Sequence, residues 1–94
     1  PSSARLEQNY PNPFNPVTLI SYSLPQSQEV RLSVFDLLGR EVARLVNRVQ
    51  AAGEHQITFN AADLPSGIYI YRLEAEAASV TRKMILLKQR TRSD

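Results

Sequence analysis

Residues 9–16, which read NYPNPFNP, constrain the fold of this chain more than any other stretch. Each of the three prolines fixes its own φ and lacks a backbone donor, and each residue before a proline is pushed toward extended geometry. A helix is thereby excluded, and a central strand nearly so. We expect a stiff extended lead-in whose aromatics, Tyr10 and Phe14, fold back onto an apolar surface while the asparagines bond locally. A rigid linker between domains is the alternative.

The length and composition predict one folded domain. The chain has 94 residues, of which 43% are hydrophobic and 21% charged, as in ordinary globular domains. No cysteine occurs, which excludes disulfides, thiolate chemistry and cysteine-based metal sites. The apolar runs are too short to span a bilayer, and the first residues lack the apolar region of a signal peptide. We expect the start at Pro1 to be a cut, with any signal peptide upstream on a longer precursor.

The charge is unevenly distributed along the chain. Residues 1–81 carry six basic and eight acidic side chains, whereas residues 82–94 carry five basic and one acidic. A nucleic-acid site would spread basic groups over a groove with aromatics between them. Here the basic groups flank a short apolar run, so we expect no nucleic-acid partner.

Alternation of polar and apolar residues organises nearly everything after Pro16. It predicts strands at residues 18–24, 29–35, 41–46, 54–60, 68–75 and 79–88. The apolar residues around 41–46 also have helical spacing, although Gly39 and the neighbouring strand patterns favour a strand. Six or seven short strands without a clear helix predict an all-β fold, an antiparallel sandwich.

Catalytic and metal-binding signals are weak. His55 is the only histidine, and no nucleophile or phosphate-binding motif accompanies it. Asp36 and Asp63 each stand alone in a turn, where capping of backbone donors is the usual role. A calcium site would need several converging oxygen ligands. The sequence therefore predicts no enzyme, no cofactor and no metal, with calcium as the open alternative.

Tyr69 and Tyr71 admit two interpretations. Their alternation with Leu73 favours a buried face of the strand at residues 68–75. If that face were exposed, two rings spaced two residues apart would form a platform for stacking on sugars. The chain would then be an accessory carbohydrate-binding module of a secreted hydrolase.

The chain closely resembles the type A C-terminal sorting domain of the type IX secretion system, found on proteins exported by Bacteroidota and related bacteria. The resemblance runs from about Leu6 to Lys88, and an immunoglobulin-like segment of flagellar hook-capping proteins is also similar. The matching blocks, in chain order, are LEQNYPNPFNP at 6–16, ISYSLP at 20–25, VFDLLGREV at 34–42, AAGEHQITFNAADLPSGIYIYRL at 51–73 and TRKMILLK at 81–88.

The resemblance implies an immunoglobulin-like sandwich of about seven strands that serves as an address for export. Residues 1–8 would be the linker from an upstream cargo domain, 9–88 the sorting domain, and 89–94 a native extension or an added tail. A precursor would cross the periplasm and be recognised by the outer-membrane translocon, and its cargo, which could be a hydrolase, would be released or held at the cell surface. In the family a sortase-like peptidase commonly cuts before this domain and joins the cargo to lipopolysaccharide. By position, the cut falls around Ser2, Ser3 and Ala4.

The recognition residues implied by the family lie in two places. Gly67 and Tyr69 match its Gly-x-Tyr and are expected to determine the fold first and recognition second. The others form the end of the last strand: Lys83, Met84, Ile85, Leu86, Leu87 and Lys88. Both faces of residues 85–87 are apolar, which suits a strand packed on one side and contacted by a partner on the other. Free edge groups would also allow strand addition, and an inner strand covered on both faces is the alternative. The family ends near Lys88, so residues 89–94 depart from its pattern.

Overall fold

A computed structural model describes residues 4–76 and 78–88, and every regular element in these ranges is a strand. The strands, in chain order, are β1 Arg5–Leu6, β2 Val17–Leu24, β3 Gln28–Phe35, β4 Glu41–Gln50, β5 Gly53–Asn60, β6 Gly67–Ala75 and β7 Ala78–Leu86. The prediction of an all-β fold of about seven antiparallel strands is confirmed.

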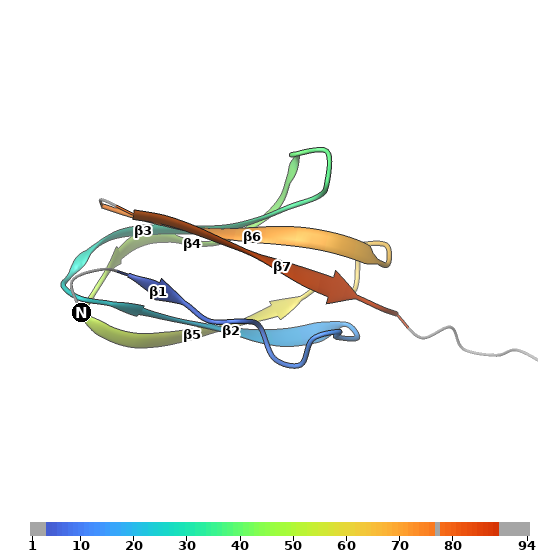
Figure 1. Cartoon of the computed structure of the whole chain (residues 1–94), viewed down its shortest axis with the longest axis horizontal. Coiled ribbons are helices and arrows are strands. Elements are labelled where there is room, and N and C mark those ends of the chain that lie inside the picture. Colours follow the sequence, from blue (N-terminus) through green and yellow to red (C-terminus); the bar gives the residue numbers. More distant parts are fainter. Residues whose placement is uncertain (1–3, 77, 89–94) are drawn as a thin grey trace, which may run out of the picture.

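The strands form two facing sheets (Figure 1). One sheet has the order β1-β2-β5 and the other β4-β3-β6-β7, and all neighbouring strands are antiparallel. This four-on-three arrangement is consistent with the expected immunoglobulin-like sandwich. The last strand, β7, lies at one edge of the four-stranded sheet, and β1 contacts it across the sandwich. The N-terminal strand β1 and the last strand β7 therefore lie next to each other on one side of the sandwich.

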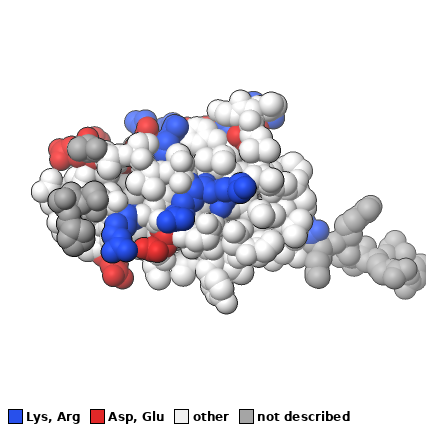
Figure 2. Space-filling model, viewed as in Figure 1, with Lys and Arg blue, Asp and Glu red and all other residues white. Residues whose placement is uncertain are grey.

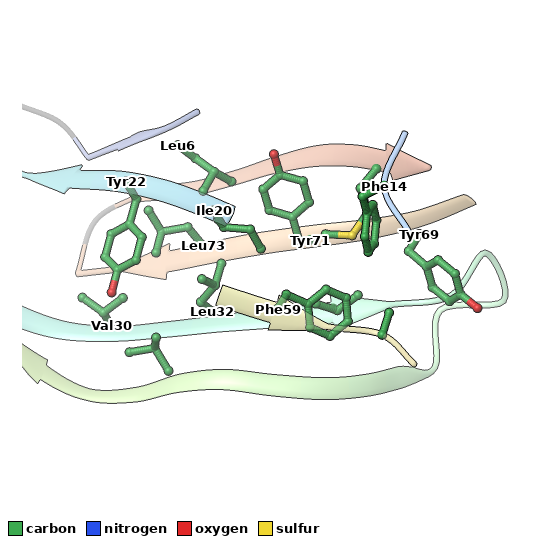
Figure 3. Packing of buried hydrophobic residues seen from close by; sticks show 14 of the residues in the cluster. Leu6, Phe14, Ile20, Tyr22, Val30, Leu32, Phe59, Tyr69, Tyr71 and Leu73 are labelled. Atoms are coloured by element: carbon green, nitrogen blue, oxygen red, sulfur yellow. The ribbon is translucent and has the colours of Figure 1, made fainter. Parts of the chain in front are cut away.

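The core lies between the sheets and follows the period of two in the sequence. Ile20, Tyr22 and Leu24 of β2 point inward, as predicted. The four-stranded sheet contributes the opposing layer, and the residues that close the core are shown in Figure 3. In the four-stranded sheet, the fully buried core residues are Val30, Leu32, Val34, Tyr71, Leu73, Met84 and Leu86.

The segment whose apolar spacing also suited a helix forms the edge strand β4. It pairs with β3 along Gln28–Phe35 and extends beyond the predicted 41–46 to Gln50. The hairpin turn explains this outcome. The Asp36 carboxylate accepts hydrogen bonds from the backbone N–H groups of Leu38 and Arg40 (2.9 and 3.0 Å), and Gly39 takes a φ of +86°. The bond from the Arg40 backbone is the main reason that the pKa of Asp36 lies below its usual value.

The sandwich begins earlier than expected. Residues 1–8 were predicted to be a linker, yet Arg5 and Leu6 form β1 opposite Ser23 and Tyr22 of β2. Leu6 is buried in the core, so this short strand packs with the sandwich. A strand of two residues is too short for alternation to reveal it.

A terminal strand closed by the N-terminal segment

The end of β7 presents two different faces. Met84 and Leu86 are completely buried and pack in the core. Lys83 and Leu87 are exposed and Ile85 is half-buried, on the opposite face of the strand. The expected strand with one packed side and one accessible apolar side is therefore present, and the alternative of an inner strand covered on both faces is wrong.

The edge of this strand is occupied, contrary to the expectation of free edge groups. We call residues 8–14 the edge segment, because they run along β7 where a further strand would lie. Phe14 forms a parallel bridge with Leu86: its N–H donates to the Ile85 carbonyl and its own carbonyl accepts from the Leu87 N–H, both at 3.0 Å. The Asn12 side-chain oxygen accepts from the Ile85 N–H at 2.9 Å. Strand addition at this half of the edge would have to displace these bonds.

A second contact continues the closure toward the start of the edge segment. The Gln8 side-chain amide donates to the Lys83 carbonyl at 2.8 Å. Beside it, the Arg82 guanidinium donates to the Leu6 carbonyl at 2.6 Å. The N-terminal residues therefore satisfy outward-facing backbone groups from Lys83 to Leu87.

Phe14 anchors the edge segment in the core. Its side chain is 2% exposed, and its ring lies 6.1 Å from that of Phe59. Figure 3 shows both rings among the buried side chains of the core. Tyr10, by contrast, is 79% exposed, so of the two aromatics expected to fold back only Phe14 does so. The backbone of Tyr10 nevertheless exchanges two hydrogen bonds with Leu19, at 2.9 and 3.0 Å.

A buried polar network holds the other end of the edge segment. The Tyr71 hydroxyl donates to the Glu7 carbonyl at 2.7 Å and accepts from the Asn9 N–H at 2.8 Å. The buried Asn9 side chain donates to Thr18 Oγ1 at 3.0 Å and to the Pro11 carbonyl at 3.2 Å. Burial raises the pKa of the Tyr71 hydroxyl, which therefore stays protonated and able to donate. These bonds link the Asn9 side chain to the backbone of Pro11 and to β2.

Gly67 and Tyr69 determine the corner before β6. The Tyr69 hydroxyl donates to the Pro65 carbonyl at 2.6 Å, and the tyrosine is buried. A tyrosine that bonds back to the corner before its strand is a known feature of immunoglobulin-like sandwiches. Gly67 opens the strand with a φ of +156°, which residues with a side chain rarely adopt. Both residues therefore serve the fold.

Tyr69 and Tyr71 belong to the core and form no stacking platform. Both are buried between the sheets (Figure 3), which confirms the interpretation favoured by the sequence. The observation that supported a carbohydrate-binding module is thereby removed.

Lys88 is tied to the loop between β5 and β6. Its ammonium group donates to the carbonyls of Ala62 (2.7 Å) and Leu64 (2.9 Å), and its backbone N–H donates to Ser66 Oγ (2.9 Å). These three bonds hold Lys88 against that loop. Lys88 therefore positions the end of the terminal strand, with its charge already engaged by the domain.

His55, the remaining candidate for catalysis, contacts other residues of the domain. The His55 ring stacks on Tyr22, with centroids 5.3 Å apart, and its Nε2 lies 2.8 Å from the Ala51 carbonyl oxygen. In residues 4–76 and 78–88, no group of three or more possible metal-ligating His, Cys, Asp or Glu side chains occurs. The same ranges contain no helix long and apolar enough to cross a membrane.

The expected cleavage linker is only partly described. Ser2 and Ser3 lie outside the described residues. Ala4 is buried in the hydrophobic core, next to the start of β1.

The fold defines a β-sandwich module whose last strand, β7, lies at the edge of a sheet. Comparison with protein families identifies it further: the model of the secretion system C-terminal sorting domain matches residues 8–87. The chain belongs to this family, the C-terminal sorting domains of the type IX secretion system. A search of curated proteins finds no match. Membership implies a fused upstream cargo, interaction with the secretion machinery, and export to the outer-membrane surface or beyond.

Proposed function

We propose that this domain directs its cargo through the outer membrane because the translocon reads the accessible side of the terminal strand. The supporting observation is the arrangement of residues 83–88, in which Met84 and Leu86 hold the strand in the core while Lys83 and Leu87 remain exposed. Lys88, just after this strand, is held to the loop between β5 and β6. Gly67, Tyr69, Met84, Leu86 and Lys88 then contribute indirectly, by positioning the side chains that the translocon contacts.

The route that follows from the family has three steps. The precursor enters the periplasm, the folded sorting domain is recognised at the outer membrane, and the cargo is released or joined to lipopolysaccharide. A sortase-like peptidase performs the cut. The domain itself supplies an address and no catalytic group to these steps.

The position of the cut is constrained by β1. Because Ala4 is buried and Arg5 and Leu6 are paired with β2, a peptidase would act on the N-terminal side of Ala4 or would first have to open β1. We therefore propose that the cut falls around Ser2 and Ser3, with Ala4 at its limit. Mass spectrometry of secreted cargo that still carries the whole domain would contradict cleavage.

An export assay tests the proposed function. Residues 1–94 are fused to the end of a periplasmic reporter in a host that has the secretion system, and we expect the reporter outside the cell. Deletion from residue 83 onward should abolish export, but it also removes two core residues. The paired change Lys83→Ser with Leu87→Ser keeps the core intact and should reduce export strongly. A reporter that stays periplasmic with the unchanged domain, or export that is indifferent to both changes, would contradict the proposal.

A further inference from the structure

We propose that the secretion machinery docks on the outer face of the four-stranded sheet. The machinery would contribute an apolar surface bordered by carboxylates. This inference rests on the proposed function and names the place and chemistry of the contact. The surface on this domain, which we call the outer patch, consists of Phe35, Ile68, Ile70, Ile85 and Leu87.

Strand register brings the members of the outer patch together. Ile68 lies opposite Ile85 in the pairing of β6 with β7, and Ile70 lies opposite Phe35 in the pairing of β6 with β3. Alternation places all of these side chains on the face away from the core, since their neighbours Tyr69, Tyr71 and Met84 point inward.

The patch is accessible to a partner. Leu87 is 55% and Ile68 38% exposed, and the other three members are half-buried. Two exposed leucines of the β3–β4 turn, Leu37 and Leu38, lie beyond Phe35. A hollow of about 320 Å³ lined by Phe35, Leu37 and Ile70 connects that turn to the sheet face. Contiguous apolar surface of this kind marks interaction sites on proteins.

The closed edge of β7 favours contact through side chains. An incoming strand would need the backbone groups of Ile85 and Leu87, and these are bonded to Asn12 and Phe14. Displacing the edge segment would also withdraw the buried Phe14 ring from the core. The outer patch, by contrast, is available without any rearrangement of the domain.

The charges around the patch indicate the chemistry of the partner. Lys83 lies opposite Ile70. The Arg72 guanidinium lies 4.5 Å from the centre of the Phe35 ring and 3.7 Å from the Glu74 carboxylate, so Lys83 is the main positive charge beside the patch. The nearby Asp36 carboxylate is engaged by the Arg40 side chain at 2.8 Å. Figure 2, which views the side of the sandwich along which β7 runs, shows Lys and Arg side chains there with Asp or Glu side chains beside them. A partner with carboxylates fits this surface, whereas a second copy of the domain would bring like charges together.

Ile68 provides a sharp test, because it lies on β6, away from both the edge of β7 and the chain end. In the export assay we expect Ile68→Glu to reduce export by about tenfold or more, since burying one aliphatic side chain at an interface changes affinity by roughly that factor. Ile68→Lys should be less damaging than Ile68→Glu, because the partner is expected to carry carboxylates. The matched control is Val49→Glu on β4, which replaces an aliphatic residue that is 65% exposed and outside the patch. Thermal unfolding of each purified domain verifies that the fold is retained.

Loss of export with Ile68→Glu and normal export with Val49→Glu would support docking on the outer patch. Normal export with both variants would overturn it and leave the sorting function in place, as would equal losses with both. Export that fails already with the unchanged domain would instead contradict the proposed function itself.

Discussion

Replacing Phe14 with alanine is expected to lower the free energy of unfolding by about 3–5 kcal/mol, the range typical of aromatic residues removed from a core. The side chain is 2% exposed and packs on Phe59, so its loss leaves a cavity between the sheets. The same residue holds the edge segment against β7 through two backbone bonds. Domains of this size are stable by only about 5–14 kcal/mol in total, so the variant should be close to unfolding at 37 °C. Urea unfolding followed by circular dichroism measures the change.

Tyr10→Ala is the matched control for Phe14→Ala, because it removes an aromatic of the same segment that is 79% exposed. We expect its free energy of unfolding to stay within about 0.5 kcal/mol of the unchanged domain. Equal effects of the two substitutions would show that Phe14 does not anchor the segment in the core.

Tyr71→Phe is expected to lower the free energy of unfolding by about 2–4 kcal/mol, although it removes a single oxygen. The hydroxyl is bonded to both the Asn9 N–H and the Glu7 carbonyl, and phenylalanine would leave these two backbone groups without that partner. An unsatisfied buried polar group costs roughly 1–3 kcal/mol. Urea unfolding again gives the value.

Tyr69→Phe separates this network from the general loss of a tyrosine hydroxyl. Tyr69 also lies in β6 and is also buried, but its hydroxyl makes one bond, to the Pro65 carbonyl. We expect a smaller decrease in stability, about 1 kcal/mol. If Tyr71→Phe lowered the free energy of unfolding no more than Tyr69→Phe, the Tyr71 hydroxyl would not be holding the N-terminal segment in place.

The sequence predicts those parts of the fold that depend on local alternation. In β2 and β6, inward and outward residues alternate without interruption, and both buried faces were predicted correctly. The outward face of the end of β7 follows from the same reasoning, because Ile85 and Leu87 alternate with the buried Met84 and Leu86.

Long-range contacts could not be predicted from local patterns. The bond between Asn12 and Ile85 joins residues 73 positions apart. The motif NYPNPFNP does not itself indicate which strand of the fold it contacts. The choice between Tyr10 and Phe14 as the buried aromatic depends on the same contact. The sequence likewise suggests that Lys88 is an exposed charge available for recognition. Only the folded chain brings its ammonium group to the carbonyls of Ala62 and Leu64.

Hydrogen bonds between the edge segment and β7 connect the N-terminal part of the domain to its last strand. Cargo is expected to precede the N-terminal segment, and that segment makes hydrogen bonds with the edge of β7. A domain whose N-terminal segment has not folded would therefore expose an unpaired strand edge, which is prone to association with other chains. Recognition through the outer patch would then select domains whose two ends are already joined.

Amide hydrogen exchange measured by NMR tests most directly whether the edge segment closes the edge of β7. The amides of Ile85 and Leu87 are bonded to the edge segment, whereas the amide of Thr81 faces the same edge without a partner among the described residues. We predict that Ile85 and Leu87 exchange more slowly than Thr81 by a factor of about ten or more, and that Asn12→Ala accelerates exchange at Ile85 while Asn12→Asp, which keeps an acceptor, does so less. Exchange at Ile85 and Leu87 as fast as at Thr81 would show that the edge is open and would contradict the account.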